Sequence, residues 1–421
     1  ISNTNFGIKY NYDTLQRIVN KNIENKYNID YAYTDISDNK TTNQIKSIKN
    51  GNDEVLNYTY DKNGNIETIS EGVNLKQKYY YDALGQLIRE NNKEINKTII
   101  YEYDTAGNIL NKKEYAYTEG EVVLDAINTN SYTYGNTEWK DQLTKYNNKE
   151  ITYDEIGNPL KYDTSIYAWE NGRLLSKVSN EQTNETIRFK YNQDGIRIQK
   201  NDIKYFVRGD KVICARDGNK IYHYSYDEAG QPIGITKVGT SYEAYYYKKN
   251  LQGDIIGILD SSLNEVAKYT YDSWGKVLSI TDENGEEITD SSHIGIENPF
   301  RYRGYWYDTE TGLYYLQSRY YNPEWGRFLN ADNMMNDTLL GKNLYAYCEN
   351  NPINNIDPDG HIVISISTLL TVATVALGVM IVYTVIGIAL DVASNISFDF
   401  AIGSSNKVKS EPTDIIATIA A

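Results

Sequence analysis

Cysteine and histidine are scarce in this chain of 421 residues, which has two of the first and three of the second. Two cysteines, Cys214 and Cys348, exclude a disulfide framework and a four-cysteine metal site. The two thiols either form one disulfide bridge or pack separately, and separate packing is favoured. His223, His293 and His361 are far apart and lack paired ligand spacing. We therefore expect no metal and no cofactor.

Basic charge is also in short supply. Lys and Arg number 42 against 57 Asp and Glu, which gives a net charge of −15. Proteins bind nucleic acids largely through Lys and Arg that neutralise phosphates, so no nucleic-acid partner is expected. The sequence contains no nucleophile elbow, phosphate loop or dinucleotide fingerprint. It begins at Ile1 without a visible signal peptide, so we expect an N-terminally truncated fragment with any secretion signal upstream.

Tyrosine, by contrast, is abundant, with 41 residues against 7 Phe and 5 Trp. Many of these tyrosines belong to a repeat that reads Tyr-Asp-x-x-Gly-x followed by an apolar residue or Pro. Degenerate copies begin at Tyr12 and Tyr191. The Asp and Gly positions of the six strict copies are Asp61 and Gly64, Asp82 and Gly85, Asp104 and Gly107, Asp154 and Gly157, Asp227 and Gly230, and Asp272 and Gly275.

Each repeat has the chemistry of a β-hairpin. Alternation such as Tyr58-Thr59-Tyr60 is typical of a strand with its rings on one face. Asp begins a turn through its side-chain oxygen, and Gly supplies the positive φ that the turn needs. One carboxylate per turn offers too few oxygens for Ca²⁺, so the turn-forming role is favoured.

Hairpins in series predict an all-β fold for residues 1–297. A single hairpin is marginally stable in water, so neighbouring hairpins must pair edge to edge into a long coiled sheet. An ordinary antiparallel sandwich is the alternative, and six strict copies of the repeat make it the weaker one. We expect antiparallel hairpins almost throughout this range, with helix below about a fifth of the residues.

The composition changes near residue 298 and again after residue 360. Residues 298–360 carry four of the seven prolines and many closely spaced Tyr and Arg residues, which predicts a compact plug of tight turns with rings packed over Arg side chains.

Residues 362–390 contain no charged residue. A helix of these residues, which rises about 1.5 Å per residue, would be longer than the thickness of a bilayer core, about 30 Å. We expect a helix that associates with lipid or with a shell interior; a buried core helix or hairpin is the alternative.

The repeats, together with residues 301–332 and 343–360, closely resemble YD-repeat proteins with an RHS repeat-associated core. This family includes bacterial rearrangement-hotspot toxins, the C component of insecticidal Tc toxins, wall-associated proteins and teneurins. The resemblance covers about residues 10–360 and implies a spiralling sheet that forms a hollow shell around the protein's own C-terminal polypeptide. The core marks the boundary before that cargo, so we divide the chain into residues 1–297, 298–360 and 361–421.

Two functions follow from this resemblance. The first is the cargo-shell module of a polymorphic toxin, which encapsulates or presents its own C-terminal segment and has an immunity protein as a further partner. The second is a wall-associated or cell-surface adhesion protein, whose Tyr, Asn and Thr side chains bind glycan or cell wall and whose apolar tail serves as an anchor. Both imply a secreted or surface location.

Many family members cut themselves at a motif resembling Pro-x-x-x-x-Asp-Pro-x-Gly-Leu. Here residues 352–360 fit that motif, but His361 stands where Leu is usual and Asn351 where Asp is frequent. Because both departures weaken the site, we expect the chain to stay whole. If it cleaves, the cut falls near Gly360-His361.

The resemblance assigns such cleavage to aspartyl-protease chemistry. Two carboxylates must then lie close together with pKa values that differ, one neutral and one charged. Asp332, Asp357 and Asp359 are the candidates. The alternative, which we favour, is that Asp357 and Asp359 form turns around the neighbouring Pro and Gly, and that Asp332 closes a loop.

Overall fold

The computed structural model describes residues 7–36, 40–122, 125–334 and 340–366. One compact unit comprises Ile1–Leu370, and a second, Thr371–Ala421, lies wholly outside the described residues. Most of the predicted apolar helix, residues 367–390, therefore also lies outside them. In the part of the chain that the structure describes, no helix is long and apolar enough to span a membrane.

Twenty-six strands form one sheet in which every strand pairs antiparallel with the next along the chain, from β1 to β26. The strands are β1 (Ile8–Tyr12), β2 (Ile18–Ile23), β3 (Tyr27–Ile36), β4 (Lys40–Asn50), β5 (Leu56–Tyr60), β6 (Ile66–Glu71), β7 (Asn74–Tyr81), β8 (Leu87–Asn92), β9 (Lys97–Tyr103), β10 (Ile109–Ala116), β11 (Asn128–Thr133), β12 (Lys145–Tyr146), β13 (Lys149–Tyr153), β14 (Pro159–Tyr162), β15 (Ser165–Glu170), β16 (Leu174–Asn180), β17 (Thr186–Tyr191), β18 (Arg197–Lys200), β19 (Ile203–Arg208), β20 (Lys211–Asp217), β21 (Lys220–Tyr226), β22 (Pro232–Val238), β23 (Tyr242–Lys249), β24 (Ile255–Leu259), β25 (Glu265–Tyr271) and β26 (Val277–Thr281).

This meander confirms the predicted all-β array of hairpins. The only helix among the described residues before 298 is the four-residue α1 (Ile294–Glu297), so helix stays far below a fifth of that range. The two thiols are separate and free, as favoured above, with Cys348 buried and Cys214 half-buried. No group of three His, Cys, Asp or Glu side chains within the described ranges is placed to hold a metal.

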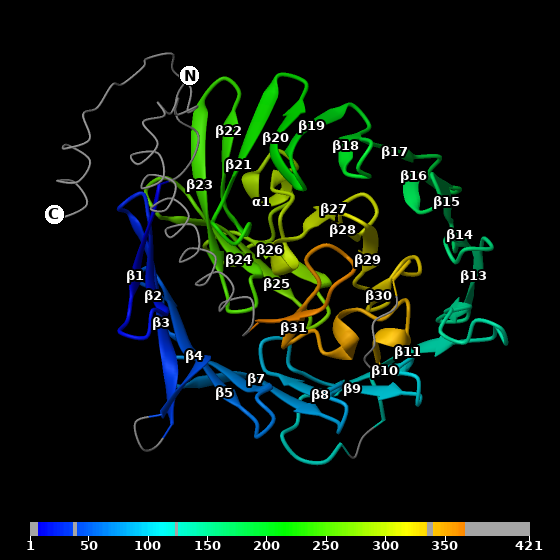
Figure 1. Cartoon of the computed structure of the whole chain (residues 1–421), viewed down its shortest axis with the longest axis horizontal. Helices are drawn as coiled ribbons and strands as arrows, with labels where there is room; N and C mark the ends of the chain where they lie inside the picture. The colour runs from blue at the N-terminus through cyan, green and yellow to red at the C-terminus, as the bar shows by residue number, and fades with distance from the viewer. Residues whose placement is uncertain (1–6, 37–39, 123–124, 335–339, 367–421) are drawn as a thin grey trace, which may run out of the picture. The chain divides into compact units, whose positions relative to one another are not determined.

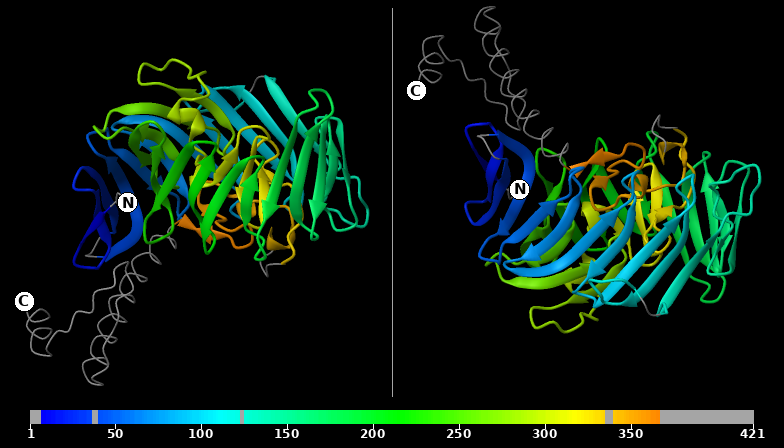
Figure 2. Two further views of the ribbon diagram at one scale, coloured as in Figure 1. Left: turned by 90° about the horizontal axis from the view of Figure 1, so that it is seen from above. Right: turned by 90° about the horizontal axis from the view of Figure 1, so that it is seen from below.

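Within this unit the sheet curves until its first strands face its later ones (Figure 1). Lys21 on β2 pairs with Asp227 of the turn after β21, with 2.7 Å between Nζ and Oδ2. Lys248 on β23 pairs likewise with Asp53 at 2.7 Å, and the Tyr58 hydroxyl accepts the backbone N–H of Leu251 at 3.1 Å. Side-chain contacts thus connect the early strands of the sheet to its later strands. Figure 2 shows the curved sheet from above and from below.

The plug predicted at residues 298–360 lies inside the curve of the sheet (Figure 1). It contains a small four-stranded sheet, and its last strand pairs with a strand that follows residue 360. Its elements are η1 (Tyr302–Gly304), β27 (Trp306–Asp308), β28 (Leu313–Leu316), β29 (Arg319–Asn322), β30 (Arg327–Phe328), η2 (Leu340–Lys342), η3 (Cys348–Asn350) and β31 (Asn355–Ile356). The partner of β31 is β32 (Ile364–Ser365). Arg side chains lie over aromatic rings, for example Arg319 over Phe328 at 3.5 Å, which matches the packing expected.

The repeat aspartates lie at the hairpin turns. Oδ1 of Asp61 accepts the backbone N–H groups of Asn63 and Asn65 at 2.8 and 2.9 Å, and Oδ2 accepts the Asn65 side chain at 3.1 Å. Gly64 has φ +86°, the left-handed region that favours glycine. The other strict copies repeat these backbone contacts. In four copies both carboxylate oxygens are used within the turn, whereas Oδ2 of Asp227 and of Asp272 pairs with a lysine of another strand.

The repeat tyrosine ties each hairpin to the one before it. The Tyr81 hydroxyl donates to the carbonyl of Ile66 at 2.7 Å, and Tyr103 donates to Leu87 at the same distance. In each case the acceptor is the second residue after the Gly of the preceding turn. A hydroxyl at the end of the ring thus satisfies a carbonyl that a Phe would leave without this donor, which explains why Tyr replaces Phe in the repeat.

Replacing Tyr81 by Phe should lower the free energy of unfolding by about 1 kcal/mol, because one intramolecular hydrogen bond is lost while the ring stays packed. Urea denaturation followed by tryptophan fluorescence measures this. Tyr80→Phe, which removes a hydroxyl from the adjacent position on β7, is the matched control and should change stability by a few tenths of a kcal/mol at most. Equal effects of the two substitutions would contradict the role given to the repeat tyrosine.

Candidate functional site

The predicted chain boundary lies on a short hairpin at the end of the plug. β31 pairs antiparallel with β32, and the peptide between Gly360 and His361 is in the loop that joins them. Gly360 has φ +81°, and a Cβ there would lie 2.5 Å from Ser318 Oγ and 2.9 Å from the Leu316 carbonyl oxygen. Only glycine fits this position without displacing the neighbouring strand.

Arg319 contacts two carboxyl groups and a backbone carbonyl next to this loop. Its side chain is only 5% exposed, and Nη2 lies 2.9 Å from Asp332 Oδ2 and 3.4 Å from Asp357 Oδ2. Its Nε donates a hydrogen bond to the carbonyl oxygen of Gly360. One buried guanidinium therefore contacts two of the three candidate carboxylates and the carbonyl group at the boundary. A buried cation of this kind needs such partners, because an unpaired charge in the interior is costly.

The two carboxyl groups have different affinities for a proton. Burial raises the pKa of Asp357 to about 6, although the Arg319 charge opposes that shift. Burial also acts to raise the pKa of Asp332, but the hydrogen bond with His361 and the charge of Arg319 outweigh it, so this pKa is lowered. Near pH 6 one carboxyl can therefore be protonated while the other is charged. This is the asymmetry that acid–base hydrolysis by two carboxyls requires.

His361 contacts Asp332 directly. Its Nδ1 lies 2.8 Å from Asp332 Oδ1, and this hydrogen bond raises the pKa of the imidazole. Asp359 accepts the backbone N–H of His361 at 3.0 Å and that of Ile362 at 3.1 Å. The structure thus brings Asp332, Asp357 and the Gly360-His361 peptide together around Arg319, and it gives Asp359 the contacts of a loop former.

Asn351, the other departure from the cleavage motif, is elsewhere in the hydrogen-bond network. Its Nδ2 donates to Asn65 Oδ1 at 3.3 Å, and its Oδ1 accepts from the Asn354 amide at 2.8 Å. None of its described hydrogen bonds goes to Arg319 or to the two carboxyls. A carboxyl at position 351 is therefore not needed to complete the cluster around Arg319.

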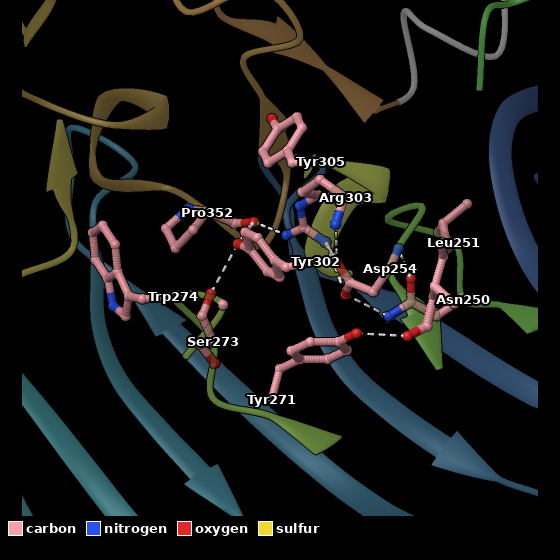
Figure 3. Close-up of polar contacts among 12 residues, drawn as sticks. Asn250, Leu251, Asp254, Tyr271, Ser273, Trp274, Tyr302, Arg303, Tyr305 and Pro352 are labelled. Atoms are coloured by element: carbon pink, nitrogen blue, oxygen red, sulfur yellow. Dashed lines mark hydrogen bonds and ion pairs between the residues drawn. The ribbon is translucent and has the colours of Figure 1, made fainter. Parts of the chain in front are cut away.

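A second buried arginine anchors the approach to this loop (Figure 3). Arg303 Nη1 contacts both oxygens of Asp254 at 2.9 and 3.0 Å, and Nη2 donates to the carbonyl of Pro352. Asp254 belongs to a turn in which Asn250 Oδ1 accepts its backbone N–H, an irregular copy of the repeat. A turn of the sheet therefore fixes the segment that leads into the boundary hairpin.

The strict pattern did not reveal every turn or every residue of the site. Asp282 forms a further turn of the same type, and Gln16 takes a positive φ of 63° where the first copy lacks its Gly. Arg319 and Arg303 were treated only as packing residues of the plug. One signal in the sequence could have identified them. Both arginines lie in short Tyr-rich runs that become buried, and a buried cation must have an acidic partner.

The comparison with known families agrees with the repeat pattern and the curved sheet. The family model described as Teneurin YD-shell matches residues 71–353, well over half of the chain. The chain belongs to this YD-shell family. A tRNA3(Ser)-specific nuclease named WapA from Bacillus spizizenii is 37% identical over 292 residues, which is 67% of this chain and 12% of that protein. The toxin subunit YenC1 of Yersinia entomophaga is 24% identical, over 72% of this chain and 36% of its own length.

Solved structures show the same fold. A Photorhabdus luminescens Tc holotoxin pore matches with a TM-score of 0.64 at 19% identity, covering 86% of this chain and 19% of that one. A crystal structure of TcdB2-TccC3 without its hypervariable C-terminal region matches with a TM-score of 0.59 over 84% of this chain and 19% of that one. This YD-shell chain therefore corresponds to a minor part of the length of the proteins it resembles.

Turn glycines on the inner side of this YD-shell touch the plug. A Cβ at Gly275 would lie 2.5 Å from the Tyr302 ring, whereas a Cβ at Gly285 would meet nothing within 4 Å, and both residues have a φ above +80°. Gly285→Ala should therefore cost about 1 kcal/mol for backbone strain alone. Gly275→Ala should cost roughly 1–3 kcal/mol more, because a plug ring must shift. Thermal unfolding of the two variants checks this, and equal losses would mean that the sheet and the plug pack independently.

Proposed function

We propose that this chain is the closing section of a cargo shell in a bacterial polymorphic toxin and that it encloses its own C-terminal polypeptide. The observation that carries the proposal is the plug of residues 298–360, which lies inside the curve of the sheet and leads into the boundary hairpin. The names of several relatives support a toxin, among them a double-stranded DNA deaminase toxin of Burkholderia cenocepacia, 25% identical over 72% of this chain.

In this proposal residues 361–421 are the first part of the cargo. A toxin of this kind is secreted or surface-borne, and its producer needs an immunity protein against the released effector. Because the chain has a net charge of −15, we expect the shell module not to bind nucleic acid, so any nuclease activity belongs to the cargo. The chain spans 12% of the WapA nuclease, so the match covers only a minor part of that protein.

Trypsin tests the enclosure, because Lys407 and Lys409 lie in the segment beyond the plug. In the native full-length protein, cleavage at these two residues should be at least tenfold slower than in an isolated peptide of residues 392–421. The difference should vanish when the protein is unfolded in urea. Mass spectrometry of timed digests identifies the cuts.

Cleavage of the native protein at the rate of the isolated peptide would contradict enclosure. If the same preparation also cosedimented with purified cell wall, the alternative role of a wall-associated protein would replace the shell. Binding to the wall without rapid cleavage would leave enclosure standing and add a surface location.

We also propose that the groups around Arg319 can hydrolyse the peptide between Gly360 and His361. Asp332 takes a proton from a water molecule as the water oxygen bonds to the Gly360 carbonyl carbon, and Arg319 stabilises the negative charge on the carbonyl oxygen. Protonated Asp357 gives its proton to the His361 nitrogen as the C–N bond breaks. Asp332 then returns the water-derived proton to Asp357, which leaves a new carboxyl end and a new amino end.

In the wild-type chain we expect this reaction not to proceed, as the departures from the cleavage motif predict. The intact mass of freshly purified protein should be 48.2 kDa. A fragment with the mass of residues 361–421 in the wild type, absent from the Asp332→Asn variant, would show that the departures are tolerated. Asp282→Asn is the matched control, since that carboxylate accepts the backbone N–H groups of Asn284 and Glu286 in a separate hairpin turn.

A further inference from the structure

We propose that His361 is a latch that keeps the boundary peptide uncut by occupying Asp332, the residue that would act as the base. This inference rests on the hydrolytic chemistry proposed above for the same cluster. It adds which residue of this chain prevents the hydrolysis. The residue concerned is one that departs from the family's cleavage motif, so the latch would distinguish this chain from self-cleaving relatives.

The contacts of Asp332 carry the inference. Oδ2 lies 2.9 Å from Arg319 Nη2, while Oδ1 accepts the backbone N–H of Met334 at 2.9 Å and pairs with His361 Nδ1 at 2.8 Å. A carboxylate oxygen offers two lone pairs, so Oδ1 is already saturated. A general base must have a free acceptor within hydrogen-bond reach of the water it activates. With the imidazole in place, Oδ1 has no free acceptor site, and the remaining one is on Oδ2, the oxygen that contacts Arg319.

The latch also fixes the peptide that would be cut. The His361 side chain is held by Asp332, its backbone N–H by Asp359 at 3.0 Å, and the preceding carbonyl oxygen by Arg319. The peptide is therefore held on both sides, and the imidazole occupies one acceptor site of Asp332 Oδ1. A leucine side chain at position 361 has no atom that could hydrogen-bond to Asp332, so Oδ1 would regain one free lone pair.

The surrounding charges favour a bound, protonated imidazole. Asp332 and Asp359 act to raise the pKa of His361, whereas partial burial and the Arg319 guanidinium act to lower it, and the hydrogen bond with Asp332 is the largest of these influences. The net shift is upward. Asp357 contacts the same guanidinium nitrogen as Asp332. The imidazole thus remains a donor to Asp332 in the pH range where Asp357 can hold a proton.

Replacing His361 by Leu should release the latch. After incubation of the full chain at pH 6, where Asp357 is partly protonated, intact-mass measurements should show residues 361–421 split from the rest at least ten times faster than in the wild type. His361→Asn is the matched control: its amide nitrogen lies close to the place of Nδ1 and should keep the chain whole. The double variant His361→Leu with Asp332→Asn should also stay whole. Circular dichroism melting curves establish that each variant is folded.

The outcomes separate the latch from the chemistry on which it rests. If the wild type and His361→Leu are cut equally fast, and Asp332→Asn stops both, the chemistry stands and the latch is wrong. If folded His361→Leu stays whole, or is cut equally well without Asp332, the proposed hydrolysis fails and the latch fails with it. Rapid cleavage of His361→Asn would also overturn the latch, because the hydrogen bond to Asp332 would then be irrelevant.

Discussion

The hydrogen bond from each repeat tyrosine to a backbone carbonyl of the preceding hairpin is the interaction on which the rest of this structure depends. A hairpin is marginally stable alone, and backbone pairing joins it only to its immediate neighbours. The Tyr81 and Tyr103 hydroxyls add a second connection that crosses from one repeat to the next. Because the connection recurs at each repeat, the sheet can curve over many strands and still present a continuous inner face of packed rings.

A curved sheet of this size must bury its inner face, and the plug supplies the covering surface. The plug brings buried cations as well as rings, so each arginine needs an acidic or carbonyl partner nearby. Arg303 finds Asp254 in a turn of the sheet, whereas Arg319 finds Asp332 and Asp357 within the plug itself. The second solution places two carboxyls and a backbone carbonyl around one guanidinium. Charge neutralisation in the core therefore places two carboxyl groups with opposite pKa shifts beside the backbone carbonyl of Gly360.

The sheet could be predicted because its turns depend on residues close together in the sequence. Most of the site around Arg319 could not, because it depends on contacts between residues that are far apart in the sequence. Asp and Gly at fixed spacing specify a turn within five residues, so the hairpins could be read from the sequence. Turns such as that of Asp260 escaped because a non-glycine residue, Leu263, takes the positive φ. Asp357 lies in the family's cleavage motif and Asp332 is a carboxyl of the preceding core segment, but their difference in pKa comes from burial, His361 and Arg319, which no spacing rule reveals. The contact between His361 and Asp332 likewise depends on the fold of the plug.

The central claim is that the sheet and its plug enclose the polypeptide that follows the boundary hairpin. Electron cryomicroscopy of the full-length protein tests this most directly. The account predicts density for the chain beyond residue 366 inside the space bounded by the YD-shell, with the plug in place as described. An empty interior, with the following polypeptide resolved outside the shell, would contradict it.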